Sequence, residues 1–537
     1  MKTLSLARFT EDYDGRHFDL LIIGGGITGA ALAYEASSRG LATALVEKDD
    51  FGGATSAATG KLIHGGLRYL QQFEIGLVRE SLRERRILSN IAPNLVYPFP
   101  IVLPKPGLLV RAGLLFYDIL SLDRRWTWDR SKRIPGHRML SADEARGAIP
   151  GGDTDRALLY YDCLCLSPER LTLYFIKSAA AHGALVANYV ESENLIIEGN
   201  RVRGAVVRDR ITGNTMKITA SVTVNATGPW TQALLNRTER TRTPLPKKRS
   251  EGIYLVTKKI TDKMVLYVGA HGHYSFAPWR GHSLIGPTEK SYYGPVDEWK
   301  VTRESIDEFL DVINRTAALP VKLARKDVLY AYGGLRPLVE TQAEDTYTAS
   351  RRSDLYDHAK DGVEGLITAA GGKYTTSREF AAQIFRHVAK KAGRPAGRPV
   401  SHARFLYGCS LPDIEGFVAD AAKKHADFGA NTVEYLVRHY GTEYEAVLAI
   451  ARTSKDLARP LNDDGEIPAQ ALFALRHESA RSLSDIFLRR TGLGTLGNPG
   501  EKTIAAISRL AVRELGWSKK ITAQETAALK RLIDVPK

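Results

Sequence analysis

Four residues with chemically useful side chains, Lys61, His64, Arg68 and Tyr69, fall within a stretch of nine residues, and two glycines directly follow the histidine. A neutral imidazole can accept a proton near physiological pH, and a guanidinium group can bind the oxygens of an anion. A polar loop that leads into a solvated helix would also contain such residues. The glycines beside a histidine and an arginine favour a pocket for an anion or a substrate.

A glycine-rich turn near the start of the chain predicts a dinucleotide site. Residues 18–23 have the pattern of a buried parallel strand, and the alanine-rich segment after the turn is typical of a helix. Between them, Gly24, Gly26 and Gly29 fit G-x-G-x-x-G, whose missing side chains let backbone N–H groups approach a pyrophosphate. Glu47 lies 18 residues beyond Gly29, the spacing of an acid that binds ribose hydroxyls. A tight turn alone would not explain a strand, a helix and an acid at these spacings. The pattern does not distinguish NAD from FAD.

Two further segments contain small residues that suit contact with a cofactor. The loop after Glu47 contains Thr55 and Ser56, whose hydroxyl groups can form hydrogen bonds while their small neighbours leave the backbone accessible. An apolar run at residues 221–225 ends in the turn Ala226-Thr-Gly228. A simple NAD dehydrogenase has less need of a second chain segment close to its cofactor, so the two segments together favour FAD.

The composition restricts the kinds of partner. The chain has 537 residues, 44% of them hydrophobic, and a formal net charge of +15. This length predicts two or three domains with substantial cores. The positive charge predicts an acidic partner: a phosphorylated substrate, an anionic membrane surface or a nucleic acid. Because the sequence has no zinc-finger spacing, RNP-like aromatic motif or long basic block, no nucleic acid is expected.

The cysteines predict a reduced, intracellular protein. Cys163, Cys165 and Cys409 are too few to form a disulfide framework in a chain of this size. We interpret Cys163 and Cys165 as packing residues and expect no metal, because no second ligand pair accompanies them. The N-terminus lacks the apolar segment of a signal peptide. These observations predict a cytoplasmic location.

Residues 55–70, TSAATGKLIHGGLRYL, together with the glycine turn closely resemble the FAD-dependent sn-glycerol-3-phosphate dehydrogenase family, and the similarity extends to the C-terminal helical region. The resemblance implies FAD as the cofactor. In flavoproteins of this kind the turn at 226–228 lies beside the flavin nucleotide, and the backbone at the position of Val190 contacts adenine. The expected cofactor-binding residues are Gly24, Gly26, Gly29, Glu47, Thr55, Ser56, Lys61, Val190, Ala226, Gly228, Gly372 and Thr375.

The resemblance also implies a reaction, the oxidation of sn-glycerol 3-phosphate to dihydroxyacetone phosphate. Hydride leaves C2 for flavin N5 while the C2 hydroxyl loses its proton, so the site needs a base, an alkoxide stabiliser and a phosphate clamp. His64 is the candidate base, although Arg336 or Lys373 could contribute. Arg336 and Lys373, which match the family motifs G-x-R-P and G-G-K-x-T-T, would stabilise the alkoxide.

Phosphate binding is expected from a second group of side chains. Arg68, Tyr69 and Arg351 would bind the phosphate oxygens, which a guanidinium fork suits. The phosphate contact assigned to Arg351 could instead come from its neighbour Arg352.

The implied fold is α/β. It comprises an FAD-binding Rossmann-like domain of the glutathione-reductase or D-amino-acid-oxidase type, an antiparallel-sheet substrate domain and a helical C-terminal domain. The expected ranges are 1–90, 150–230 and 330–395 for the FAD domain, 91–149 and 231–329 for the substrate domain, and 400–537 for the helical domain.

Several local patterns predict individual elements within these domains. Residues 157–161 are expected to form a strand of the main sheet, and residues 302–314 a helix with Thr302 as N-cap. Arg336 is placed in a rigid turn by its neighbouring glycines and proline. Thr522 and Glu525 predict a capping box.

An apolar, aromatic stretch at residues 96–128 could lie in a membrane interface, with Arg124 and Arg125 near anionic lipid. An ordinary buried helix with a basic edge explains it equally well. Family members that donate electrons to quinone attach to one membrane leaflet, which favours quinone as acceptor and attachment to the inner face of the cell membrane. The basic residues 244–249 are read as a solvated loop. The C-terminal helices serve packing or dimerisation, so a homodimer stays open.

Three alternative functions remain at this stage. The protein could be a glycerol-3-phosphate oxidase that uses oxygen, or a related amino-acid or hydroxy-acid flavin oxidase, which would prefer a carboxylate to a phosphate. A non-enzymatic flavin-binding scaffold is the third alternative. The cluster of His64, Arg68, Arg336 and Lys373 argues against a scaffold, because binding alone does not need it.

Overall fold

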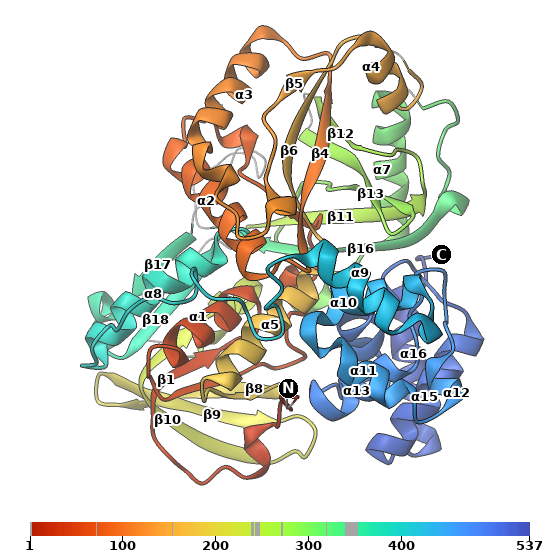
Figure 1. Ribbon diagram of the computed structural model, residues 1–537. Helices are drawn as coiled ribbons and strands as arrows, with labels where there is room; N and C mark the ends of the chain where they lie inside the picture. Colours follow the sequence, from red (N-terminus) through yellow and green to blue (C-terminus); the bar gives the residue numbers. More distant parts are fainter. Residues whose placement is uncertain are drawn as a thin grey trace.

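The computed structural model describes residues 3–70, 72–152, 154–237, 241, 248–269, 272–317, 319–338 and 353–537. Within these ranges the chain forms two large sheets and a group of C-terminal helices (Figure 1). The two sheets take their strands alternately from the first three quarters of the chain, so residues far apart in sequence meet where the sheets adjoin.

The described part of the first sheet has eight strands in the order β17-β18-β10-β1-β2-β7, with β8 and β9 attached to β10. Its central pairings, β10 with β1 and β1 with β2, are parallel. The strand bounds are β1 Phe18–Ile23, β2 Thr43–Val46, β7 Leu185–Ala187, β8 Val190–Glu198, β9 Arg201–Asp209, β10 Thr215–Asn225, β17 Ser353–Asp357 and β18 Leu366–Gly371.

The centre of the first sheet is buried because helices pack against it. All six residues of β1 are buried, as expected for a parallel strand without an exposed face. Three helices, α1 (Ile27–Ser37), α5 (Pro168–Ala181) and α8 (Ser377–Lys391), contribute to the same hydrophobic core. Cys163, Cys165 and Cys409 are buried in this core, which confirms that they pack.

The described part of the second sheet has ten strands, of which eight follow the order β15-β11-β14-β13-β12-β4-β6-β3. β16 pairs with β11 and β5 with β6; β4 and β12 are parallel, whereas the other pairings between described strands are antiparallel. The bounds are β3 Leu62–Ile63, β4 Val96–Pro104, β5 Arg138–Met139, β6 Ala157–Cys165, β11 Arg249–Lys258, β12 Met264–Gly269, β13 Gly272–Trp279, β14 His282–Gly286, β15 Lys290–Tyr292 and β16 Val328–Pro337.

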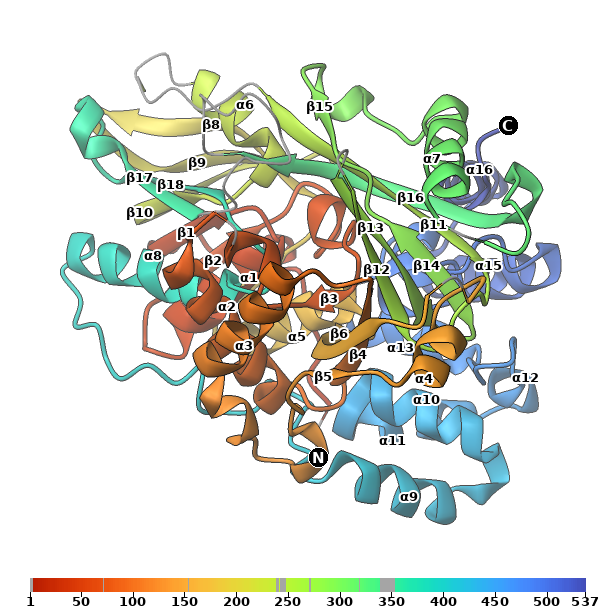
Figure 2. The ribbon, with the colours of Figure 1, turned by 90° about the horizontal axis from the view of Figure 1, so that it is seen from above.

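Helices cover the second sheet and connect it to the first. Helix α7 (Arg303–Thr316) packs on strands β11, β13 and β14, and lies beside them in Figure 2. Its N-cap is Thr302, as predicted, and the Thr302 hydroxyl accepts a hydrogen bond from the Ser305 backbone N–H. The remaining helices of this part are α2 Ile75–Ile91, α3 Leu108–Leu120, α4 Ala142–Ala148 and α6 Thr231–Asn236.

The strand predicted at residues 157–161 exists, but its assignment to the main sheet is wrong. β6 pairs along its whole length with β4 in the second sheet. Leu158 and Tyr160 pack in one hydrophobic cluster and Leu159 in another, on the opposite face. The sequence of a strand shows that both faces are buried but does not identify the neighbouring strand, which is decided by packing.

The prediction that Arg336 lies in a rigid turn is also wrong, since Arg336 belongs to strand β16 and lies opposite Ser250 of β11. The glycines before it serve a close approach between two strands. A Cβ atom on Gly333 would lie 2.4 Å from the carbonyl oxygen of Gly252. A glycine pair in a strand therefore resembles a turn signal in sequence but has another cause here. β6 and β16 lie in ranges predicted for the FAD domain, and the domain boundaries themselves stay predictions.

The C-terminal region is helical from residue 414 onward and has its own hydrophobic core. Its helices are α9 Ile414–Lys424, α10 Ala430–Tyr440, α11 Tyr444–Ala451, α12 Lys455–Ala458, α13 Ala469–His477, α14 Leu483–Asp485, the π-helix η12 Ile486–Arg490, α15 Glu501–Leu515 and α16 Lys519–Ile533. Figure 1 shows them packed beside both sheets. The homodimer stays a prediction.

The capping box predicted at Thr522 and Glu525 is wrong. Helix α16 begins one turn earlier, where the Ser518 hydroxyl accepts a hydrogen bond from the Ile521 backbone N–H. The Glu525 carboxylate instead accepts a hydrogen bond from the Leu483 backbone N–H of a neighbouring helix. The local pattern was ambiguous because two hydroxyl residues precede the same apolar face.

Every helix in the described ranges is too short or too polar to span a lipid bilayer.

Candidate active site

A cavity of about 960 Å³ lies where the two sheets meet, a volume near the upper end of the range for ligand pockets. Its wall includes most of the residues predicted from sequence. These are Gly24, Gly26, Glu47, Thr55, Ser56, His64, Arg68, Tyr69, Val190, Ala226, Gly228, Arg336, Gly372, Lys373 and Thr375.

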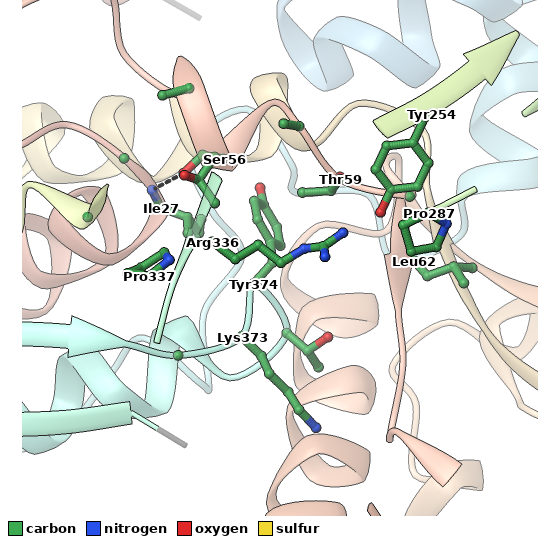
Figure 3. Close-up of a pocket in the computed structure, with 18 of the residues that line it drawn as sticks. Ile27, Ser56, Thr59, Leu62, Tyr254, Pro287, Arg336, Pro337, Lys373 and Tyr374 are labelled. Carbon is green, nitrogen blue, oxygen red and sulfur yellow. Dashed lines mark hydrogen bonds between the residues drawn. The ribbon is translucent and has the colours of Figure 1, made fainter. Parts of the chain in front are cut away.

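The glycine turn forms one end of the cavity and has no room for side chains. Gly24 has a φ of 113°, and a Cβ atom on it would lie 2.5 Å from the carbonyl oxygen of Ala226. A Cβ atom on Gly29 would lie 1.9 Å from the carbonyl oxygen of Gly24. The Ser56 hydroxyl accepts a hydrogen bond of 2.9 Å from the Ile27 N–H at the start of α1 (Figure 3). The turn, the loop at Ser56 and the start of a helix thus form a cradle suited to a pyrophosphate.

Glu47 lies at the end of β2 and holds the neighbouring backbone. Its carboxylate accepts hydrogen bonds of 2.6 Å from the Gly25 N–H and 2.9 Å from the Asp49 N–H. Burial raises the pKa of Glu47 to about 7. The Val190 N–H donates to the Glu47 carbonyl oxygen at 2.7 Å, so the acid and the predicted adenine contact are adjacent.

Lys373, Tyr69 and His64 lie together at the other end of the cavity. The Lys373 Nζ lies 3.7 Å from the centre of the Tyr69 ring and donates to the Ser81 hydroxyl at 3.1 Å. The His64 backbone N–H donates to the Thr375 hydroxyl at 3.2 Å. The loop after β18 therefore contacts the loop that precedes the 3-10 helix η3 (Leu67–Leu70), although the two bonded residues are 311 positions apart in sequence.

Burial strongly affects the protonation of this group. Desolvation, assisted by the nearby charge of Lys373, lowers the pKa of His64 to about 3, so its imidazole is neutral at physiological pH. Desolvation and the charge of Arg68 lower the pKa of Lys373 to about 7. Perturbed groups that face a cavity are typical of active sites.

Arg68, in the 3-10 helix η3, and Arg336, in strand β16, both line the cavity. Arg68 donates to the Glu289 carboxylate at 3.3 Å and to the Tyr69 hydroxyl at 3.4 Å. Arg336 donates to the Ser250 hydroxyl at 3.3 Å and extends into the cavity in Figure 3. A Cβ atom on Gly252 would lie 2.2 Å from the Arg336 guanidinium, so the absence of a side chain there makes room for it.

Several residues of the cavity wall were not predicted from the sequence. Tyr254, His273 and Glu289 come from the second sheet and its connections, and Asp162 comes from β6. The Gly65 N–H donates to Asp162 at 3.2 Å, and Asp162 forms a buried ion pair of 2.6 Å with Arg85. No local sequence signal identifies these residues, because their strands reach the cavity only after the sheets have formed.

Two predicted site residues, Gly29 and Lys61, do not line the cavity, and a third is outside the described part of the chain. Gly29 lies behind the turn, where its role is close packing. The Lys61 ammonium turns away and pairs with Glu169 at 3.3 Å, so its side chain is not brought to the cavity. Arg351, together with Arg352, lies outside the described residues.

Comparisons with known proteins match both parts of the chain. A family model described as "FAD dependent oxidoreductase" matches residues 19–378, and one described as "C-terminal domain of alpha-glycerophosphate oxidase" matches residues 399–522. A glycerol-3-phosphate dehydrogenase from Synechocystis sp. is 33% identical, over 94% of each chain. The chain belongs to the FAD-dependent glycerol-3-phosphate dehydrogenase family.

Two further relatives of this dehydrogenase family complete the comparison. The crystal structure of the glycerol-3-phosphate dehydrogenase from Bacillus halodurans, complexed with FAD, has a TM-score of 0.78 and 26% identity, and the match covers 98% of this chain and 97% of that one. D-erythritol 1-phosphate dehydrogenase from Brucella abortus is 30% identical, over 88% of this chain and 94% of the relative. The predicted family, fold class and FAD cofactor are confirmed.

The residues of this family member fit FAD. The cradle of Gly24, Gly26 and Ser56 would hold the pyrophosphate, and Glu47 and Val190 lie where a ribose and an adenine would be bound. The turns at Gly228 and Gly372 line the same cavity and would face the flavin.

Proposed function

We propose that the protein oxidises sn-glycerol 3-phosphate to dihydroxyacetone phosphate. The observation that carries this proposal is the group of cations gathered at one end of the cofactor cavity, where Arg68, Arg336 and Lys373 lie with His64. A phosphorylated alcohol needs positive charge for its phosphate and a proton acceptor for its hydroxyl. The names of the relatives from Synechocystis and Bacillus halodurans agree with this substrate.

Each side chain has a proposed role. Arg68 and Tyr69 bind the phosphate, with Arg351 as the third predicted contact. Arg336 and Lys373 stabilise the developing alkoxide at C2. His64 accepts the hydroxyl proton: its imidazole is neutral because burial lowers its pKa, and the negative charge of a bound phosphate would raise that pKa towards a useful value. Bound FAD supplies the hydride acceptor.

The substrate can be tested by anaerobic bleaching of the flavin. The purified protein should be yellow, and sn-glycerol 3-phosphate should bleach it without added NAD, whereas glycerol and amino acids should not, because they lack the phosphate. Arg68→Met should weaken substrate binding by about 2 kcal/mol or more, measured from the concentration dependence of the bleaching rate.

The comparison substrate is D-erythritol 1-phosphate, named for one relative. If D-erythritol 1-phosphate bleaches the flavin faster, it is the substrate in place of sn-glycerol 3-phosphate. Bleaching by an amino acid alone would contradict a phosphorylated substrate altogether.

The roles of Lys373 and His64 predict a pH dependence. Because the pKa of Lys373 is about 7 before substrate binds, and an anionic substrate raises it, the rate of flavin reduction should fall as the pH rises through and above that range. The rate falls at alkaline pH because the Lys373 ammonium loses its charge. Lys373→Met should lower the rate by about a hundredfold and remove this fall, measured by stopped-flow reduction at saturating substrate.

The opposite result would change the assignment. If the rate instead falls on the acidic side, near pH 7, and Lys373→Met removes that fall, then Lys373 is the base. An acidic fall that persists in Lys373→Met but disappears in His64→Gln supports His64.

We propose quinone as the electron acceptor. One part of the cavity wall is apolar and is formed by Ile101 and Leu103 of β4, Met264 and Leu266 of β12, and Val110 of α3. Such a surface suits the ring and tail of a quinone, whereas oxygen needs no shaped site.

The acceptor can be tested with the reduced protein. Mixing it with a soluble short-chain quinone should reoxidise the flavin faster than air-saturated buffer does, and Met264→Asp should slow only the quinone reaction, since it places a charge on the apolar wall. Faster reoxidation by oxygen would favour the oxidase alternative.

We further propose that the protein attaches peripherally to the inner face of the cell membrane through α3. Leu108 and Leu109 are 81% and 78% exposed, and Leu122 and Trp126 beyond the helix are 73% and 71% exposed. Arg111 is exposed on the same helix. Exposed apolar side chains beside arginines suit the headgroup region of an anionic bilayer. The second basic segment, residues 244–249, lies mostly outside the described residues.

Attachment can be measured by flotation with vesicles that contain anionic lipid. Leu109→Glu should reduce binding about tenfold or more, because it replaces an apolar side chain that inserts into the bilayer with a charge of the same sign as the lipid. Val321→Glu is the matched control, since Val321 is 78% exposed in another part of the protein. Equal binding of the two variants would contradict the role of α3.

A further inference from the structure

The aspartate Asp50 joins the C-terminal helical region to the FAD site. Asp50 lies three residues after Glu47 and is 1% exposed. Its carboxylate accepts hydrogen bonds from Arg489 Nε and from Arg490 Nη1 and Nη2, each at 2.7 Å, and from Asn188 Nδ2 at 2.9 Å. A carboxylate buried this deeply is therefore fully satisfied, and two of its partners come from the other end of the chain.

The ion pair remains charged despite its burial. Desolvation alone would raise the pKa of Asp50, but the guanidinium groups of Arg490 and Arg489 hold that pKa below its ordinary value. A buried carboxylate left without these partners would carry a large desolvation cost. The loop that contains Asp50 is therefore strongly bound to the C-terminal region.

The arginines are themselves held in place. They are the last two residues of the π-helix η12, whose wide turn is closed by the bond from the Thr491 N–H to the Ile486 carbonyl oxygen at 2.9 Å. The Arg490 Nε donates to the Glu478 carbonyl oxygen, and Arg489 pairs with Asp485 at 2.5 Å. π-helical turns are rare and are frequently found at functional sites.

The same loop is part of the cofactor cradle. Asp50 and its neighbour Asp49 belong to the cavity wall. The Gly52 N–H donates to the Gly25 carbonyl oxygen at 3.0 Å, and the Gly53 N–H donates to the Asp50 carbonyl oxygen at 3.2 Å. A displacement of Asp50 would therefore disturb the glycine turn and the start of the loop that leads to Ser56.

A second contact reaches the adenine side of the site. The Tyr189 hydroxyl donates to Asp485 at 2.7 Å, and the Tyr189 N–H donates to the Asp49 carbonyl oxygen at 2.8 Å. The N–H of the next residue, Val190, donates a hydrogen bond to the Glu47 carbonyl oxygen. The segment of the C-terminal region around η12 thus contacts both chain segments that border the adenosine end.

We propose that the C-terminal helical region sets the affinity for FAD, because Arg489 and Arg490 fix Asp50 and with it the loop between Glu47 and Ser56. Asp50, Arg489 and Arg490 are positioning residues, since none of them is placed to react with substrate. Coupling of this kind is reciprocal, so FAD also holds the C-terminal region in place.

The proposal is tested by titrating FAD into the full-length apoprotein. Asp50→Asn and Arg490→Lys should each raise the Kd for FAD about tenfold or more, measured by the change in flavin fluorescence. Arg489→Met is a milder variant, because it removes a single hydrogen bond to Asp50, and it keeps the test available if the other two do not fold.

The matched control is Arg280→Lys. Arg280 forms a partly buried ion pair with Asp464 at 2.5 Å and donates to the Gly492 carbonyl oxygen at 2.7 Å, so it also joins the second sheet to the C-terminal region, but it does not touch the loop of Asp50. This variant should lower the Tm while the Kd for FAD stays within about twofold of the wild-type value. If the Asp50 and Arg489 variants lower the Tm without changing the Kd, or if Arg280→Lys weakens FAD equally, the proposal is wrong.

Hydrogen exchange of the wild-type protein gives an independent readout. Addition of FAD should slow amide exchange in residues 486–494, which do not line the cofactor cavity, and Arg489→Met should reduce this protection. Unchanged exchange in this segment on FAD binding would overturn the proposal.

Discussion

The site depends on positive charge that is kept away from water. Lys373 is half-buried, and its ammonium lies 3.7 Å from the centre of the Tyr69 ring. Desolvation and the charge of Arg68 lower the pKa of Lys373, and desolvation and the charge of Lys373 lower the pKa of His64. Charge held in this way is costly without an anion, so the same arrangement that destabilises the cations favours an anionic substrate. Other features serve this requirement: Gly252 makes room for Arg336, and Ser81 and Glu289 provide the nearby polar partners.

The interleaved topology brings these groups together. The chain leaves the first sheet after β2, contributes β3 to β6 to the second sheet, returns for β7 to β10, and crosses again through β11 to β16 before β17 and β18. The crossings after β2 and after β10 contribute residues to the cavity wall. His64 follows β3 and Arg336 belongs to β16 of the second sheet, whereas Lys373 follows β18 of the first, so residues distant in sequence share one cavity.

The C-terminal region has a closer relation to the cofactor than its lack of nucleotide motifs suggests. Its helices form a core of their own, yet Arg489 and Arg490 form buried ion pairs with Asp50 near the adenosine end. A separately packed region would not need to place two arginines around one buried aspartate. The arrangement makes the stability of the cofactor loop and the docking of the helices parts of the same interaction.

The sequence by itself determined the cofactor turn and the family, and most of the site residues predicted from it line the cavity. Those signals are local: Gly24 to Gly29 and Glu47 belong to one strand-turn-helix-strand unit, and the turn at Gly371-Gly-Lys373 carries its own motif. Only the tertiary structure decided that β6 belongs to the second sheet, that Arg336 lies in a strand, that the Lys61 side chain pairs with Glu169, and that Asp162 and Glu289 line the cavity. The physical reason is that strand pairing and burial depend on both partners, whereas a sequence pattern describes one.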